Sequence, residues 1–343
     1  MRRLGAILGL GLAVVTPAAP AMAEGGVELL SFADLDGWAG DDHAAALDVF
    51  RTTCPDMDGP EWQALCALAE NAADARTYFE LFFRPVLIGG EGPALFTGYY
   101  EPELDGSRRR TARFRYPLYR TPREARDGVW VSRRQIEEQG LLEGRGLEIA
   151  WVDDPVELFF LQVQGSGRIR LSDGSVIRVG YGGRNGQPYR SIGRELVRRG
   201  VFDRHEVSAQ VIRSWVRRNP SAGRDLLYHN PSYIFFREVE IADAALGPLG
   251  AMNRSITPLR TIAVDPVHTP LGAPVWIEKN GAAPMRRLMV AQDTGGAIRG
   301  RQRADIFFGH GDAAGEAAGT VRDPGRMVVL LPIELAHQRT PDA

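Results

Sequence analysis

The stretch MVAQDTGGAIRGRQRADIFFGHG (residues 289–311) joins two short apolar runs through a loop rich in glycine and arginine. Asp293 lies at the end of the first run and Asp305 at the start of the second. Both runs are strand-like, because they are short, apolar and bounded by glycine. A tight turn needs one glycine, whereas this connection contains several. A loop that holds a ligand or a catalytic group could need all of them.

Strand alternation would place each aspartate on an apolar face. Asp293 is expected to share a face with Met289 and Ala291, and Asp305 with Phe307. Burial raises the pKa of a carboxyl group, and a second carboxylate nearby raises it further. Such an acid stays protonated near neutral pH and can donate a proton to a leaving oxygen. The alternative is that both aspartates only cap turns, as Asp beside Gly often does.

The remaining sequence predicts an α+β protein that is mainly β. Apolar residues at three- to four-residue spacing predict helices from about residue 41 to residue 84. Beyond this point, short β-branched or aromatic runs predict many strands, including one over residues 156–171. Helices are expected at 132–142 and between 191 and 219. No alternating strand–helix rhythm is present, which argues against a doubly wound parallel sheet.

Composition and charge exclude several classes of function. The chain has 343 residues, 44% hydrophobic and 24% charged, which suits one or two domains with a sizeable core. A formal net charge of −2 supplies no basic field, so nucleic acid is not expected as a partner. The 6 histidines have no metal-site spacing, and no Gly-x-Ser-x-Gly elbow occurs. We therefore expect neither a metal nor a cofactor.

The N-terminus reads as a secretory signal peptide over residues 1–23. Two arginines precede an apolar run, and Ala21-Met22-Ala23 forms a small-x-small cleavage site before Glu24. No cysteine follows the predicted cleavage site, so a lipid anchor would have no attachment point there. The mature protein is expected to be exported.

Export determines how the 2 cysteines are interpreted. Cys54 and Cys66 stand twelve positions apart and flank a turn-like segment. An oxidising compartment favours a disulfide between them. The alternative is a pair of buried helix thiols.

Neutral polar and aromatic side chains gather between residues 159 and 193. Amides, hydroxyls and flat aromatic rings are the groups that recognise an extended, uncharged carbohydrate. The alternative is the polar surface of a β-hairpin. The residues concerned are Gln162, Gln164, Ser166, Asn185, Gln187, Tyr181 and Tyr189.

Five segments of the chain resemble the lytic murein transglycosylase A family. The resemblance covers residues 98–332, and Asp265, Asp293 and Asp305 fall at the three aspartate positions of the wider three-aspartate (3D) domains. The segments are TGYYEPEL (97–104), DDPVELFFLQVQGSGRIRLSDGSVIRVGYGGRNGQPYRSIG (153–193), NPSYIF (230–235), TIAVDPVHTPLGAPVWI (261–277) and MVAQDTGGAIRGRQRADIFFG (289–309).

This resemblance implies a fold of two domains. The larger would contain a double-psi β-barrel and the helical start, from residues 24–104 together with 240–343. A smaller β-barrel, residues 105–239, would be inserted as a glycan-binding domain. A groove between the two would hold the substrate.

The resemblance also implies a peptidoglycan lytic exotransglycosylase, a carbon–oxygen lyase. Such enzymes cleave the β-1,4 bond between N-acetylmuramic acid and N-acetylglucosamine and leave 1,6-anhydromuramic acid ends. Asp305 would act first as acid and then as base, with Asp293 as its catalytic neighbour. Asp293 and Asp265 would tune or orient Asp305 rather than act as nucleophiles, and Asp265 would also lie at the substrate site. Tyr100 and the Gln164-Gly165-Ser166 turn are the other candidate glycan contacts.

Two other functions remain open. An inverting glycoside hydrolase would use Asp293 and Asp305 with a water between them, and a non-catalytic protein would only bind peptidoglycan. Glycan strands are the expected partner, other cell-wall enzymes are further candidates, and a monomer is expected. The expected location is the periplasm. The best-known family members are lipoproteins of the outer membrane, so outer-membrane association stays open for this chain.

Overall fold

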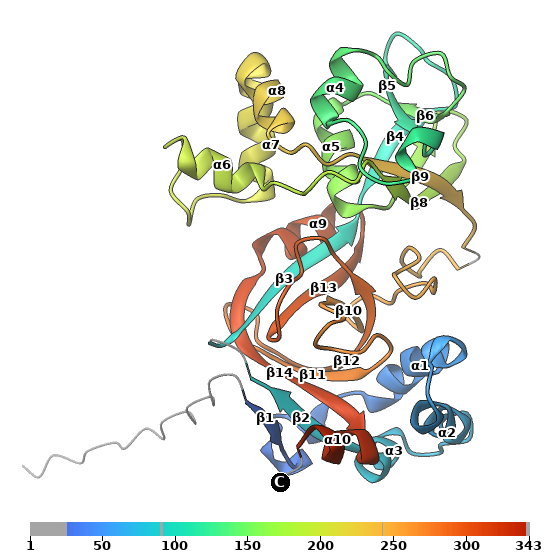
Figure 1. The fold of residues 1–343 in the computed structure, drawn as a ribbon, viewed down its shortest axis with the longest axis vertical. Coiled ribbons are helices and arrows are strands. Elements are labelled where there is room, and N and C mark those ends of the chain that lie inside the picture. The colour runs from blue at the N-terminus through green and yellow to red at the C-terminus, as the bar shows by residue number, and fades with distance from the viewer. Residues whose placement is uncertain (1–25, 90–91, 242, 341–343) are drawn as a thin grey trace, which may run out of the picture.

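The computed structural model describes residues 26–89, 92–241 and 243–340 (Figure 1). The predicted signal peptide, residues 1–23, lies outside the described residues. Two sheets dominate the fold, one of eight strands and one of six. The α+β, mainly β class is therefore confirmed. None of the helices in the described ranges is long and apolar enough to cross a membrane.

Six strands of the larger sheet close into a barrel, because β14 pairs with β3 as well as with its neighbours β2 and β11. The pairs β10–β12 and β13–β3 are parallel, and the other pairs of the sheet are antiparallel. The strands, in sheet order, are β1 (Val27–Leu29), β2 (Phe83–Ile88), β14 (Arg322–Pro332), β11 (Pro274–Lys279), β12 (Met285–Thr294), β10 (Thr261–Val264), β13 (Arg303–His310) and β3 (Ala94–Glu101).

Apolar side chains fill the barrel and also join it to the N-terminal helices. Phe96, Ile262, Val275, Met289 and Ile306 belong to one buried cluster that draws on all six barrel strands. A second cluster packs the helices against the outer face of the barrel. These helices are α1 (His43–Thr53), α2 (Pro60–Ala69), α3 (Ala75–Phe82) and the C-terminal α10 (Ile333–Arg339).

The N-terminal helices differ from the sequence prediction at one end. A disulfide joins Cys54 to Cys66, the pairing that the sequence predicted, and ties the end of α1 to α2. The helical pattern, however, stops at Phe82 rather than at residue 84. Phe83 is already extended and pairs with Pro332, because pairing with β14 overrides the local helical pattern.

The smaller sheet is built entirely from the chain between β3 and β10. Together with the closed barrel, it confirms the predicted double-psi β-barrel with an inserted, smaller barrel-like unit. Figure 1 shows this unit at one end of the molecule, with α6, α7 and α8 beside it. Its strands, in sheet order, are β5 (Tyr116–Tyr119), β6 (Glu148–Val152), β4 (Glu103–Ser107), β7 (Gly167–Leu171), β8 (Val176–Arg184) and β9 (Ile234–Val239).

Five helices accompany this sheet, and one of them corrects the sequence prediction. They are α4 (Arg133–Glu138), α5 (Pro155–Gln164), α6 (Ile192–Arg198), α7 (Ala209–Arg218) and α8 (Pro220–Tyr228). The strand predicted over residues 156–171 is instead helix α5 followed by β7. Asp154 caps the first turn, Pro155 starts it and Gly165 ends the helix with a φ of 83°. Because α5 is buried between two apolar clusters, it shows no polar face in the sequence.

A buried ion cluster ties together the two chain segments that connect the sheets. Glu101, at the end of β3, is fully buried and accepts hydrogen bonds from Arg168 at 2.8 Å and from Arg178 at 2.8 Å. Both arginines also donate to the carbonyl of Leu246, in the segment that returns to the barrel. The cluster therefore fixes how the inserted unit stands over the barrel. Helix α9 (Gly311–Thr320) packs against β3 and β13 nearby.

Candidate active site

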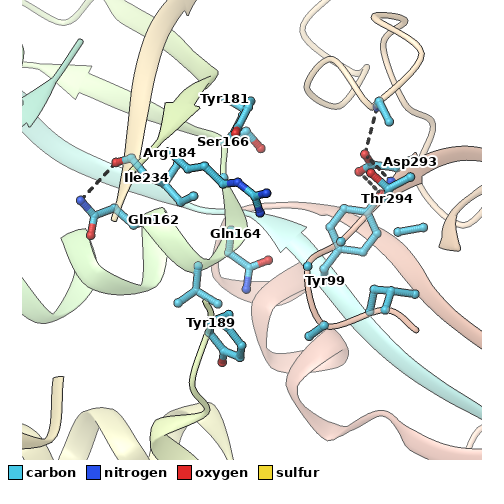
Figure 2. A pocket seen from close by; sticks show the side chains of 18 of the residues that line it. Tyr99, Gln162, Gln164, Ser166, Tyr181, Arg184, Tyr189, Ile234, Asp293 and Thr294 are labelled. Carbon is cyan, nitrogen blue, oxygen red and sulfur yellow. Dashed lines mark hydrogen bonds between the residues drawn. The ribbon is translucent and has the colours of Figure 1, made fainter. Parts of the chain in front are cut away.

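A pocket of about 970 Å³ lies between the two sheets. Figure 2 shows its two walls. The inserted unit contributes polar and aromatic side chains, and the barrel contributes both aspartates of the 289–311 stretch. Lining residues used below are Gln164, Gly165, Ser166, Tyr181, Arg184 and Tyr189 on one wall, and Tyr99, Asp293, Thr294, Gly295, Gly296 and Asp305 on the other.

A β-bulge places the two aspartates on the same face of the barrel wall. Ile262 pairs with Ala291, but the next residue, Ala263, pairs with Asp293, so the register shifts by one residue. On its other side, Ala263 pairs with Asp305. Residues paired across strands project to the same face, so both carboxyl groups flank Ala263. The expectation that Asp293 shares a face with Ala291 is wrong, because the bulge reverses the alternation.

Asp305 is partly buried at the pocket, with one oxygen held and the other free. Its Oδ1 accepts a hydrogen bond from the Thr97 hydroxyl, which itself accepts one from Arg303 at 2.8 Å. Its Oδ2 has no hydrogen-bond partner in the described parts of the chain. Burial raises the pKa of Asp305, against the lowering effects of Thr97 and of the Arg303 charge. A raised pKa and a free oxygen suit a proton donor.

Asp293 is held by three donors. The Tyr99 hydroxyl donates to Oδ2 at 2.9 Å, and the N–H groups of Ala251 and Thr294 donate to Oδ1 at 3.0 and 2.9 Å. Burial raises the pKa of Asp293 to about 6, and the charge of Asp305 adds to this rise. The pKa of Tyr99 lies well above its usual value, because the phenol is buried and faces Asp293. Asp293 is therefore a fixed acceptor beside Asp305.

Tyr99, and not Tyr100, lies in the wall of the pocket. Alternation along β3 sends the two rings to opposite faces. Tyr100 accepts a hydrogen bond from Arg213 at 3.0 Å and faces Gly315 in α9, outside the pocket lining. Tyr100, the predicted glycan contact, therefore lies away from the pocket.

Asp265 also lies outside the pocket lining. Its Oδ2 accepts a hydrogen bond from Gly300 N–H at 2.9 Å, and Oδ1 one from Val267 N–H at 3.3 Å. The Gly300 bond is the main cause that lowers the pKa of Asp265. Asp265 thus anchors the β12–β13 loop, whose Gly295 and Gly296 do line the pocket.

The Gln164-Gly165-Ser166 turn is brought to the pocket as the end of α5. Gln164 Oε1 accepts from the Tyr100 N–H at 3.4 Å, which links this turn to β3. Tyr181 and Tyr189 stand on the same side of the pocket (Figure 2). Of the polar run predicted from sequence, Asn185 alone is absent from the lining, because its buried amide holds backbone groups of neighbouring segments instead.

Clusters of metal-binding side chains are absent from the described ranges. There, no group of three or more His, Cys, Asp or Glu side chains is placed to bind an ion. The charges at the pocket are instead Asp293, Asp305 and several arginines. The chemistry that this arrangement offers is proton transfer by a carboxyl group.

Comparisons with known proteins agree with this architecture. Residues 95–237 match the MltA specific insert domain, and residues 260–331 match the 3D domain. Membrane-bound lytic murein transglycosylase A of Vibrio cholerae is 31% identical over 281 residues, which are 78% of this chain and 74% of that protein.

Solved structures give the same result. A membrane-bound lytic murein transglycosylase from Agrobacterium tumefaciens aligns with a TM-score of 0.83 at 35% identity, covering 92% of this chain and 99% of that one. Escherichia coli MltA with bound chitohexaose aligns with a TM-score of 0.76 at 29% identity, covering 92% and 97%. The chain therefore belongs to the membrane-bound lytic murein transglycosylase A family.

Proposed function

We propose that this protein is a lytic transglycosylase of peptidoglycan. It would cleave the β-1,4 bond between N-acetylmuramic acid and N-acetylglucosamine and leave a 1,6-anhydro end. The observation that carries the proposal is Asp305, a carboxyl group with a raised pKa and a free oxygen on the wall of the pocket between the two sheets. The names of its relatives, and the chitohexaose bound by one of them, support a glycan as the ligand.

The reaction needs one carboxyl group in two protonation states. Protonated Asp305 donates its proton to the glycosidic oxygen while the bond from that oxygen to C1 of the muramic sugar breaks. The Asp305 carboxylate then accepts the proton of the C6 hydroxyl, whose oxygen forms the new bond to C1. The acid is regenerated and no water is consumed. Raised pKa values suit this role, since the acid must be protonated near neutral pH.

Asp293 supports Asp305 in this scheme rather than activating water. Three donors already occupy its two oxygens. An inverting hydrolase would require a second carboxylate free to act as base on a water molecule. The hydrogen bonds of Asp293 therefore favour transglycosylation over inversion.

The two sheets have different roles in this proposal. We assign glycan binding to the inserted unit, residues 105–239, through Gln164, Gly165 and Ser166. Residues 24–104 and 240–343 would supply the acid. With residues 1–23 as an export signal, the protein would act in the periplasm, where its substrate lies. Cell fractionation tests this location: recovery with the cytoplasmic fraction would contradict it.

Asp305→Asn tests the assignment of the acid. The amide keeps the size of the side chain but cannot donate a proton to the glycosidic oxygen, so release of muropeptides from purified sacculi should fall by about 10³-fold. Asp312→Asn, at an exposed position on α9, is the matched control. Undiminished release by Asp305→Asn would refute the role of Asp305. No release by the native protein would favour the glycan-binding alternative.

A further inference from the structure

A hydrogen-bonded chain lies behind Asp305, on the side away from the pocket. Arg303 donates to the Thr97 hydroxyl oxygen, and Thr97 donates to Asp305 Oδ1. Asp305 lines the pocket, but Thr97 and Arg303 do not. The β3–β13 pairing fixes this arrangement, since Asp305 pairs with Thr97 and Arg303 with Leu95. These two residues can therefore act on the reaction only through Asp305.

The polarity of this chain is determined by what each group can donate. Arginine has donors only, so the Arg303–Thr97 bond must use a lone pair of the hydroxyl oxygen. Threonine has one hydroxyl hydrogen, and in the described residues Asp305 Oδ1 is its acceptor. If Oδ1 carried the acid proton, the hydroxyl hydrogen would lose that acceptor. A buried donor without an acceptor is costly, so the protonated acid carries its hydrogen on Oδ2.

We propose that Arg303, acting through Thr97, is a positioning residue that keeps the catalytic proton on Oδ2 of Asp305. This oxygen is the one left free for the glycan. The same contact leaves Oδ2 as the base that accepts the C6 proton in the second half of the reaction. The inference rests on the proposed role of Asp305 and adds two residues that do not touch the substrate.

The charges around Asp305 define what a pH profile would report. On β13 itself the charged group is Arg303, and β12 contributes Asp293. Strand β3 contributes Tyr99, and Arg322 of β14 pairs with Thr97 from the other side of β3. Strand β10 faces Asp305 with Ala263, which does not titrate. The arginines that line the pocket are Arg133, Arg184 and Arg237 of the inserted unit and Arg299 of the β12–β13 loop.

Thr97→Val and Thr97→Ser separate the hydroxyl from its packing. Valine keeps the shape of the side chain but removes the donor to the carboxylate. The alkaline limb of the pH profile of kcat/KM should therefore shift to higher pH by on the order of one pH unit. On the plateau, kcat should fall by about tenfold while KM stays near the native value. Serine restores the hydroxyl and should restore both the limb and kcat. Loss of activity in both variants would overturn the proposal, because a hydroxyl role predicts rescue by serine.

Arg303→Met releases the Thr97 hydroxyl to turn, so the proton can also occupy Oδ1. Plateau kcat should fall by about fivefold, whereas in a Thr97→Val background the same change should cost less than about twofold. Arg322→Met is the matched control, because Arg322 is exposed and, within the described chain, donates to neither Thr97 nor Asp305. It removes a nearby positive charge and should leave plateau kcat unchanged.

These outcomes test the positioning role of Arg303 and Thr97 separately from the proposed transglycosylase activity. Equal losses from Arg303→Met in the native and Thr97→Val backgrounds would show that Arg303 acts independently of Thr97, which contradicts the proposal. An unchanged kcat for Arg303→Met would contradict it as well. Asp305→Asn is assayed in the same series: if that variant stays active, the proposed function fails, whatever the other variants show.

Discussion

Asp293→Asn should change the free energy of unfolding more favourably at alkaline pH than at acid pH, each measured against the native protein. Asparagine fits the same space: its oxygen can accept from Ala251 and Thr294, and its amide can donate to the Tyr99 oxygen. The buried charge is removed, the three contacts are kept, and only the Tyr99 hydroxyl hydrogen loses its acceptor. The variant should therefore fold.

The magnitude follows from the raised pKa of Asp293. Its value of about 6, against an ordinary 3.8, corresponds to on the order of 3 kcal/mol, since each pH unit is worth about 1.4 kcal/mol. The folded state holds this proton more tightly than the unfolded state does. The stabilisation is thus fully present below about pH 3.8 and lost as pH rises through about 6. Between pH 4 and pH 8 the native protein should lose roughly 2 kcal/mol through this group.

Urea unfolding at pH 4 and pH 8 measures the effect, with Asp312→Asn as the control at an exposed site. The quantity compared is the free energy of unfolding of Asp293→Asn minus that of the native protein. This difference should be about 2 kcal/mol larger at pH 8 than at pH 4. The control should show no such change. If the difference between Asp293→Asn and native protein is the same at both pH values, the burial argument for Asp293 is refuted.

Three further results are expected. Glu101→Gln should lower the free energy of unfolding by about 3 to 5 kcal/mol in urea melts, because two buried arginines lose their counter-charge; a loss under 1 kcal/mol would contradict this. Replacing Cys54 and Cys66 together by serine should cost roughly 2 to 3 kcal/mol, and unchanged melting would refute a stabilising disulfide. The kcat/KM for sacculi should fall as pH rises through the raised pKa of Asp305, since the acid must start protonated; a rate that rises with pH over that range would count against an acid role.

The sequence identified the two aspartates of the site but not how they meet. Asp293 and Asp305 could be found from their positions at the ends of apolar strands. Their common face depends on the bulge between Ile262 and Ala263. Register depends on how two strands pair, and a bulge is not visible in the sequence of one strand. Regular alternation along β12 therefore predicts the wrong face for Asp293.

Other misses have similar physical causes. Alternation showed that Tyr99 and Tyr100 face opposite ways, but only the packing of α9 shows which ring leaves the pocket. Glu101 gave no local signal, because its arginine partners lie 67 and 77 positions away. Helix α9 was missed because its alanine- and glycine-rich sequence carries no apolar stripe.

Helix α5 did carry readable signals at both ends. Asp154 before Pro155 is an N-terminal cap, and Gly165 is a C-terminal one. The continuous apolar run between them suggested a strand, since buried helices and buried strands share that pattern. Caps that enclose ten residues are the better guide in this case.

The mass of the glycan ends released from purified sacculi tests the central claim most directly. If Asp305 transfers the C6 proton and closes the ring, the muramic acid ends formed by the native protein are 1,6-anhydro ends, each lighter by one water than a reducing end. Asp305→Asn should then release almost none. Reducing ends from the native protein would mean that water attacks C1, and would contradict the single-carboxyl mechanism.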